Sequence, residues 1–330
     1  MTVTRRAPVR RPARRATWTA GVWVLVLPGA VWAVVRAGGW ERGPLVPLFA
    51  FTPYVAAGVW LPALLATVSR RWLAAAVGVS AAAMLTSGVL PRALPDRDGG
   101  PLDGVGLRVM TANLLAGSAD AGAIVDLVRQ NDVAVLALQE ITPGARQRLQ
   151  VAGLDDLLPY SSVATEHGVS GSAVYSRFPI TAPGATRNTG GFRQAFGTVQ
   201  PPGAEPLDVV SAHPAAPSGL DLIPDWFADL ATEPRADPSG PPRLLLGDFN
   251  ATLDHAPLRR LISHGYRDAA DAAGAGLIGT WGPYLGRRIP AVTIDHVLVD
   301  RRVGVRDVQV RRIPHSDHRA VIATLAIPPA

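Results

Sequence analysis

Three long apolar stretches lie in the first hundred residues, and the rest of the chain alternates between short apolar runs and polar segments. Trp18–Val35, Leu45–Val68 and Trp72–Leu90 contain 18, 24 and 19 residues, and none of them includes a charged side chain. At about 1.5 Å per residue, each is long enough to cross a hydrocarbon layer roughly 30 Å thick. The pattern therefore predicts an anchor of three transmembrane helices over residues 18–91.

Arginines flank these apolar stretches. Six of them lie in residues 1–17, which is also typical of a cleaved signal peptide, but no small-residue cleavage site is evident and two more apolar stretches follow. Arg70 and Arg71 lie in the loop after the second stretch. The positive-inside rule then predicts a cytoplasmic N-terminal tail, and three crossings put everything after about residue 91 outside the cell.

The remaining chain has the pattern of an α/β domain. Residues 92–104 are rich in Pro, Gly and Asp, which is typical of a linker, and residues 105–330 follow as the candidate domain. Strands are predicted at 107–113 and 133–140, with a helix between them at 121–131 where apolar residues have helical spacing. Further apolar runs rich in β-branched residues follow, so the pattern favours layers of strands and helices.

Charge is distributed unevenly. The formal net charge is +6, yet residues 1–100 hold 12 arginines against 3 acidic residues, whereas residues 101–330 hold 20 against 23. The candidate domain is thus slightly acidic and lacks the dense basic stripe that binding to a phosphate backbone uses. The chain has no cysteine, which excludes disulfides and thiolate metal sites.

Polar side chains lie at the ends of apolar runs at six places along the candidate domain. Each has an ordinary alternative explanation as a turn former, a cap or a loop residue. Strand ends at one edge of a sheet are also where α/β domains place their functional sites. The candidate site residues are Asn113, Glu140, His213, Asp248 with Asn250, Asp295, and Asp317 with His318.

The order of these residues resembles the endonuclease/exonuclease/phosphatase superfamily, whose fold is that of pancreatic deoxyribonuclease. The stretches that carry the resemblance span residues 107–325 and are VMTANL, LALQEI, SAVYSRFPI, VVSAHP, LLLGDFNA, TIDHVLV and HSDHRAV. The resemblance implies a four-layered α/β sandwich of two packed mixed β-sheets flanked by helices, here preceded by three transmembrane helices. It also implies hydrolysis of a phosphate ester with Mg²⁺, or with Mn²⁺ as the alternative.

The resemblance also implies which side chains hold the metal. Glu140 corresponds to the principal ligand with Asn113 beside it, and Asp317 is a metal ligand or a partner of the ligands. Carboxylate and amide oxygens suit a hard cation such as Mg²⁺. Zinc is less favoured, because no histidines cluster at the short spacings of zinc sites.

The catalytic roles are implied in the same way. Asp248 corresponds to the residue that orients or deprotonates the attacking water, and Asn250 and His213 correspond to hydrogen-bond donors to the scissile phosphate. Asp295 is expected to hold one ring nitrogen of His213, which would fix its tautomer. His318 is expected to contact the phosphate or to transfer a proton.

Other histidines and Arg193 are weaker candidates for the functional site. His167, His255 and His264 are predicted to be surface or loop residues, and His315 is predicted to have a structural role beside the site. Arg193 lies in a segment that could reach the substrate.

The membrane anchor and the acidic domain favour a membrane-tethered phosphoesterase acting on a lipid-linked or headgroup phosphate. This architecture resembles that of actinobacterial membrane proteins of the superfamily associated with teicoplanin resistance, which would make a cell-wall lipid carrier the substrate. The alternatives are an anchored extracellular nuclease, a non-catalytic envelope binding or resistance protein, and an enzyme for soluble sugar or inositol phosphates.

Overall fold

The computed structural model describes residues 12–96, 100–283 and 289–330. The chain divides into two compact units. The helical unit contains Met1–Trp40 and Thr52–Val89, and the sandwich unit contains Glu41–Phe51 and Leu90–Ala330. A short segment from the predicted membrane anchor therefore folds with the candidate domain.

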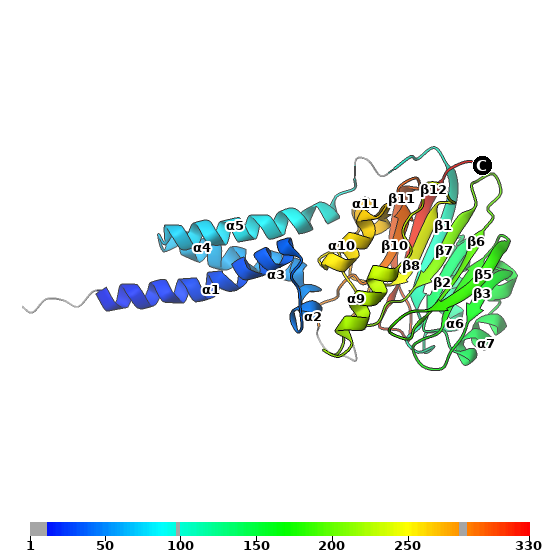
Figure 1. The fold of residues 1–330 in the computed structure, drawn as a ribbon, viewed down its shortest axis with the longest axis horizontal. Helices are drawn as coiled ribbons and strands as arrows, with labels where there is room; N and C mark the ends of the chain where they lie inside the picture. The colour runs from blue at the N-terminus through cyan, green and yellow to red at the C-terminus, as the bar shows by residue number, and fades with distance from the viewer. Residues whose placement is uncertain (1–11, 97–99, 284–288) are drawn as a thin grey trace, which may run out of the picture. The chain divides into compact units, whose positions relative to one another are not determined.

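The helical unit consists of apolar helices packed through small residues. They are α1 (Pro12–Gly38), α3 (Thr52–Gly58), α4 (Trp60–Val68) and α5 (Trp72–Val89), labelled in Figure 1. Two candidate membrane spans, Ala16–Gly38 and Trp72–Ala93, are long and apolar enough to cross a membrane, whereas Thr52–Val68 is shorter. Among the described residues, the three long spans predicted from the sequence are therefore not confirmed.

The predicted span Leu45–Val68 was wrong as a single helix. Its first part forms the short helix α2 (Leu45–Phe49), which belongs to the sandwich unit, and α3 begins only at Thr52. Val46 and Phe49 are buried, with at most 1% of their surface exposed. An uncharged run suits a protein core as well as lipid, and prolines at 44, 47 and 53 interrupt helical hydrogen bonding.

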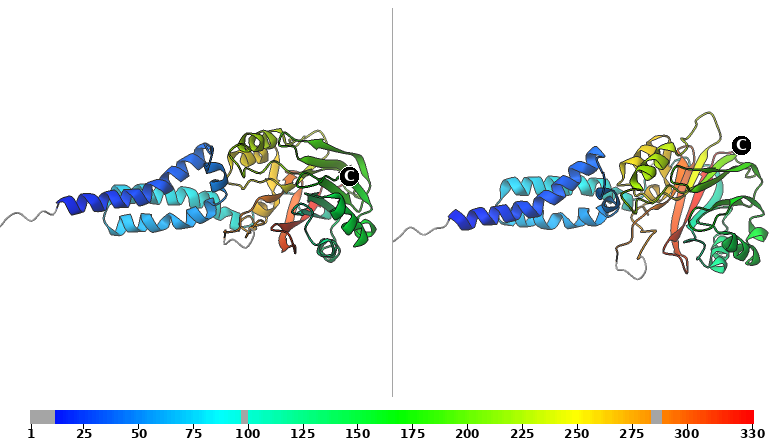
Figure 2. Two further views of the ribbon diagram at one scale, coloured as in Figure 1. Left: turned by 90° about the horizontal axis from the view of Figure 1, so that it is seen from below. Right: turned by 60° about the horizontal axis from the view of Figure 1, so that its bottom comes forward.

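Two six-stranded sheets form the centre of the sandwich unit (Figures 1 and 2). The first has the order β11-β12-β1-β2-β4-β3, and the second has the order β5-β6-β7-β8-β10-β9. The strands of the first sheet are β1 (Val105–Asn113), β2 (Val135–Gln139), β3 (Tyr160–Ala164), β4 (Ser172–Ser176), β11 (Gly304–Arg312) and β12 (Arg319–Ile327). Those of the second are β5 (Ile180–Arg187), β6 (Arg193–Val199), β7 (Leu207–Ala212), β8 (Arg243–Asp248), β9 (Tyr266–Asp268) and β10 (Asp295–Asp300).

Helices cover the outer faces of both sheets. Apolar side chains of α6 (Ala121–Gln130) and α7 (Pro143–Val151) share a buried cluster with β1 and β2, and α8 (Leu154–Leu157) joins them. On the other sheet, α9 (Ile223–Thr232) and α10 (Ala256–Ser263) pack over β8 and β10. A third apolar cluster fills the space between the sheets, with alanines from α11 (Ala269–Ala272), which contacts the short 3₁₀ helix η1 (Leu90–Ala93). The four-layered α/β sandwich is thus confirmed.

Strand direction brings the ends of the central strands to one edge. β1 and β2 are parallel with Asn113 opposite Gln139, and β7 and β8 are parallel with Ala212 opposite Gly247. β10 runs antiparallel to β8, so its first residue Asp295 pairs with Asp248, the last residue of β8. β12 likewise runs antiparallel to β1, and its start lies at the same edge. The polar residues that follow or begin these strands therefore meet.

Candidate active site

The structure brings the eight predicted site residues together at this edge. Six of them line a cavity of about 680 Å³: Glu140, His213, Asp248, Asn250, Asp317 and His318. Asn113 and Asp295 do not line it, but both are buried and hydrogen-bonded to residues that do. All eight thus belong to one connected polar cluster.

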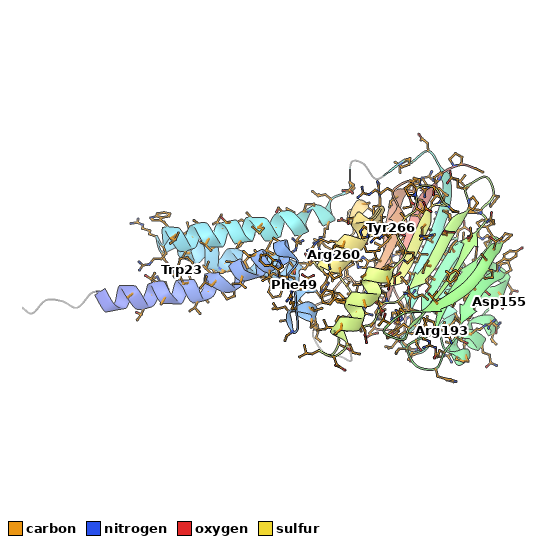
Figure 3. The ribbon with its side chains drawn as sticks, in the orientation of Figure 1. Trp23, Phe49, Asp155, Arg193, Arg260 and Tyr266 are labelled. Carbon is orange, nitrogen blue, oxygen red and sulfur yellow. The ribbon has the colours of Figure 1, made fainter. Side chains whose placement is uncertain are left out.

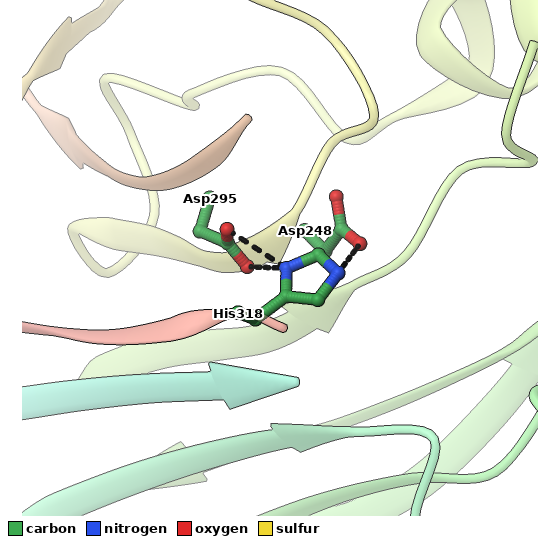
Figure 4. Close-up of side chains that lie close together, drawn as sticks. All are labelled: Asp248, Asp295 and His318. Atoms are coloured by element: carbon green, nitrogen blue, oxygen red, sulfur yellow. Dashed lines mark hydrogen bonds and ion pairs between the residues drawn. The ribbon is translucent and has the colours of Figure 1, made fainter. Parts of the chain in front are cut away.

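His318 lies between two carboxylates in the arrangement shown in Figure 4. Its Nδ1 is 3.0 Å from each carboxylate oxygen of Asp295, and its Nε2 is 3.7 Å from Oδ2 of Asp248. All three residues are buried. The expected pairing of Asp295 with His213 was therefore wrong, because Asp295 holds the ring of His318 instead.

Charge in this group favours a protonated His318. Burial by itself lowers the pKa of the imidazole, but the carboxylates of Asp295, Asp248 and Asp317 raise that pKa to about 10. Burial raises the pKa of Asp248 to about 6, against the opposing effect of His318. Near neutral pH the group consequently contains an imidazolium between two carboxylates, with Nε2–H directed to Asp248 and the cavity.

Glu140 occupies the end of β2 in a left-handed backbone conformation, with φ of 58°. Its Oε1 accepts a hydrogen bond from Nδ2 of Asn113 at 2.9 Å, and its Oε2 accepts one from the backbone N–H of Ala116 at 2.5 Å. Nδ2 of Asn113 also donates to Oδ2 of Asp248 at 3.0 Å. Burial raises the pKa of Glu140. A strained, buried carboxylate of this kind is typical of functional sites.

The hydrogen bonding of the Asp317 carboxylate indicates where a metal ion fits. Its Oδ2 accepts a hydrogen bond from Nε1 of Trp281 at 3.0 Å, whereas its Oδ1 is buried and has no hydrogen-bond partner in the described part of the chain. The charge of Asp317 contributes to the raised pKa of Glu140, so the two carboxylates interact. Oδ1 also lies 3.9 Å from Nε2 of His318. A buried carboxylate oxygen that accepts no hydrogen bond, with a second carboxylate nearby, fits a hard divalent cation.

A second candidate position for a cation involves the residues of Figure 4. One ligand atom from each of Asp248, Asp295 and His318 can be chosen so that all lie within 4.8 Å of one another. However, both oxygens of Asp295 already contact the protonated Nδ1 of His318. The arrangement suits hydrogen bonding and proton transfer better than coordination of a cation, so Glu140 and Asp317 fit the metal better.

The side chains of His213 and Asn250 are held by different contacts. His213 is buried against the ring of Phe192, with centroids 4.7 Å apart, and burial lowers its pKa, which favours neutral imidazole. Its Nε2 is 3.9 Å from Oδ2 of Asp248. Asn250 instead donates from Nδ2 to the carbonyl of Pro214 at 3.0 Å, which fixes the loop that follows β8. Their expected contacts with a phosphate remain predictions.

Some residues of this region were missed from the sequence. Trp281 binds Asp317 as described, and Oγ of Ser316 donates to the carbonyl of Asn113 and accepts from the N–H of His318. His296 is buried and pairs through Nδ1 with Asp268 at 2.7 Å. Only their closeness to the recognised stretches in sequence could have indicated them.

His255 lies in the loop that precedes α10, as predicted, but its side chain is 1% exposed rather than at the surface. His167, His264 and His315 are exposed. Arg193 is bound to Glu166, with its Nε 3.0 Å from Oε2, and it does not line the cavity.

Known proteins share the fold of the sandwich unit. A model of the Endonuclease/Exonuclease/phosphatase family matches residues 110–318, more than half of the chain. Among solved structures, the chain is similar to an endonuclease/exonuclease/phosphatase from Beutenbergia cavernae DSM 12333, with 20% identity and a TM-score of 0.54 over 68% of this chain and 72% of that one. Truncated TDP2 of Caenorhabditis elegans matches with 18% identity and a TM-score of 0.52, over 68% and 99% of the two chains.

Among curated protein sequences, none matches this chain. The likenesses to solved structures show a shared fold, and the family match covers residues 110–318 of this chain. The chain belongs to the Endonuclease/Exonuclease/phosphatase family, and it is a metal-dependent hydrolase of phosphoester bonds.

Proposed function

We propose that the protein is a membrane-tethered, Mg²⁺-dependent phosphoesterase that hydrolyses a lipid-linked or headgroup phosphate at the cell envelope. One observation carries this proposal: the candidate catalytic residues open into a cavity whose other lining side chains are mostly apolar. A cavity with polar catalytic residues and an otherwise apolar lining suits a substrate that has a phosphate at one end and a hydrocarbon group at the other.

In this proposal Glu140 and Asp317 hold the cation, with Asn113 orienting Glu140 through its hydrogen bond. When bound, the cation neutralises charge that develops on the phosphoryl oxygens and on the leaving group. Near it, Nε2–H of His318 donates to a phosphoryl or leaving oxygen, and Asp295 keeps the ring in this orientation.

Asp248 is the proposed base. It accepts a proton from the attacking water as the new O–P bond forms in line with the ester bond that breaks. A carboxylate with a pKa near 6 is suited to this role close to neutral pH. The backbone N–H of Asn250 donates to Oδ1 of Asp248 at 2.9 Å, which leaves Oδ2 directed at His318 and the site.

The charge of the cavity disfavours a nucleic acid as substrate. No arginine is present among the described residues that line it, and the chain contains no lysine. Proteins that grip nucleic acids neutralise several phosphates with basic side chains. A substrate with one phosphate group fits this lining better than a polyanion does.

Chain connectivity supports an extracellular sandwich unit. Glu41–Phe51 and Leu90–Ala330 fold together, so the end of α1 and the end of α5 must lie on the same side of a membrane. The chain between them then crosses and returns, with Arg70 and Arg71 at the turn. At about 1.5 Å per residue, the 17 residues of Thr52–Val68 span roughly 25 Å, which requires a thin or locally deformed bilayer. The positive-inside rule places the turn in the cytoplasm.

The proposal is tested with full-length protein purified in detergent and supplied with Mg²⁺. Phosphate release from a polyprenyl pyrophosphate and a phospholipid panel is compared with nicking of plasmid DNA, using Glu140→Ala and His318→Ala as controls. We expect turnover of a lipid phosphate that each substitution lowers by about 10² or more. DNA nicking with the same sensitivity would favour the nuclease, and inactivity on every lipid by folded, Mg²⁺-binding protein would overturn the lipid assignment.

A further inference from the structure

The segment Glu41–Phe51 joins α1 to α3 along the chain, but it folds as part of the sandwich unit. Val46 is fully buried in an apolar cluster that also contains Trp226 and Tyr266. Phe49 is also buried, and Figure 3 labels it in this segment and Tyr266 in the sandwich unit. The segment is therefore anchored to the sandwich unit through the side chain of Val46.

Two hydrogen bonds fix the segment to the start of α10. Oε1 of Glu41 accepts a hydrogen bond from the backbone N–H of Ala256, in the first turn of that helix, where main-chain donors lack helical partners. The carbonyl of Val46 accepts a hydrogen bond from Nε2 of His255 at 2.8 Å. Nδ1 of His255 accepts from the N–H of Thr252 at 2.8 Å, so the ring carries its proton on Nε2. The segment thus has one defined position on the sandwich unit.

This position places part of the segment in the wall of the candidate active site. Pro47, Ala50 and Phe51 line the same cavity of about 680 Å³ as Asp248 and His318. Other lining side chains are also apolar, among them Leu115, Val169, Phe192, Leu222 and Ile294. Glu41, by contrast, is turned into the protein, so the segment presents no charge to the cavity.

We propose that Pro47, Ala50 and Phe51 form a substrate-binding wall that receives the hydrocarbon group of an amphiphilic phosphoester. The proposal rests on the proposed function, because it assigns a position to the apolar part of that substrate. The cavity volume lies in the range of about 300–1,000 Å³ found for ligand pockets. With the phosphate at Asp248 and His318, an attached chain meets this wall within the same cavity.

The residues that are buried in the protein are other members of the segment than the three that form the wall. Val46 and Phe49 are buried in the protein, whereas Ala50 and Phe51 are only half-buried and Pro47 is exposed. Leu48 is 47% exposed and does not line the cavity. Leu48 therefore provides a matched control for substitutions of the wall.

The kinetic test uses full-length protein and 4-methylumbelliferyl phosphodiesters that carry either a methyl or a dodecyl group. Their leaving group is the same, so the ratio of their kcat/KM values reports recognition of the alkyl chain. We expect the wild type to prefer the dodecyl ester, and Phe51→Ala to lower the ratio by about tenfold because it removes a large apolar contact. Ala50→Leu, which narrows the cavity without removing an anchor, should lower it too, whereas Leu48→Ala should leave it unchanged.

A binding test separates this proposal from the proposed function. A dodecyl phosphonate with a diazirine at the chain end is irradiated with the full-length protein, and the labelled peptide is identified by mass spectrometry. Labelling within residues 47–51, weakened by Ala50→Leu, supports the wall even if no lipid phosphate is hydrolysed, in which case only the proposed substrate fails. Labelling elsewhere, or a dodecyl preference that neither wall substitution changes, overturns the wall while the lipid substrate stands.

Discussion

The arrangement of His318 between two carboxylates depends on residues that are distant in sequence. Asp295 holds Nδ1 through both of its oxygens, and Nε2 is left to face Asp248. An imidazolium buried in this way is oriented by its partners, because Asp295 is hydrogen-bonded to Nδ1 and the carboxylate of Asp248 lies 3.7 Å from Nε2. Loss of one carboxylate therefore changes the position of the ring as well as the charge of the site.

We predict that Asp295→Asn lowers kcat by about 10²–10³ with a much smaller change in KM, because the ring of His318 loses its fixed orientation. Steady-state kinetics on any hydrolysed phosphoester measure this split. A matched control is Asp268→Asn, which removes the partner of His296 instead, outside the cavity. An equal effect of the two substitutions would indicate a general structural defect and contradict the orienting role.

Glu233 is a buried carboxyl group outside the active site, and burial raises its pKa from 4.5 to about 8. The folded protein therefore binds its proton more tightly than the unfolded chain does. The free energy of unfolding should fall as the pH rises from about 4.5 to about 8, because the unfolded state loses this proton first. The carboxylate then destabilises the folded protein at alkaline pH.

We predict that Glu233→Gln raises the melting temperature relative to wild type much more at pH 8.5 than at pH 5, with a gain of about 1–3 kcal/mol at the higher pH. Thermal unfolding across this range measures the difference. Glu166→Gln is the control, since that exposed carboxylate binds Arg187 and Arg193 and has a lowered pKa. A pH-independent gain from Glu233→Gln would contradict the assignment.

The polar residues of the site were predictable because each lies at one end of an apolar run that forms a strand. Their partners were not predictable, because pairing depends on strand direction and register. Asp295 lies opposite Asp248 only because β10 is antiparallel to β8 in this register. His318 reaches Asp295 from β12, in the other sheet. The sequence order of the polar residues contains neither fact, so His213 was assigned to Asp295 in error.

At the scale of elements, the corner that precedes α10 binds both segments of chain that connect to the helical unit. Asp254 accepts two hydrogen bonds of 2.8 Å from the guanidinium of Arg92 in η1, and the pair is almost fully buried. The next two residues, His255 and Ala256, bind the segment Glu41–Phe51. Three consecutive residues thus hold elements that are about 40 residues apart in sequence.

We predict that Arg92→Ala destabilises the sandwich unit by about 3–5 kcal/mol, because it leaves the buried carboxylate of Asp254 without its main ionic partner. Chemical denaturation followed by tryptophan fluorescence measures the loss. Arg306→Ala is the control, since Arg306 makes only exposed hydrogen bonds to backbone carbonyls. A loss below about 1 kcal/mol for Arg92→Ala would show that water or another side chain replaces the ion pair.

The incorrect prediction of Leu45–Val68 as one membrane helix also concerns the scale of elements. Uncharged residues were counted as one membrane span, although hydrophobicity cannot distinguish burial in lipid from burial in a protein core. The prolines in the run are tolerated in membrane helices, so they did not show that part of the run would join the sandwich unit. That choice depends on complementary surfaces, here the cluster around Trp226 and the backbone N–H of Ala256 in the first turn of α10.

For the whole molecule, the order of segments along the chain does not match the division into units, since Glu41–Phe51 completes a fold that otherwise starts at Leu90. We predict that a chain beginning at Leu90 is less stable than the full-length protein by at least about 1.5–3 kcal/mol, because burial of Val46 in the sandwich unit is lost. Such a loss of stability is large against the roughly 5–15 kcal/mol that stabilises a typical domain.

Joining residues 41–51 to Leu90 through a flexible Gly/Ser linker should restore most of the lost stability, while the same linker joined to a scrambled segment should not. Urea denaturation of these four chains compares their stabilities, and equal midpoints would mean that the segment is bound too weakly to form part of the sandwich unit.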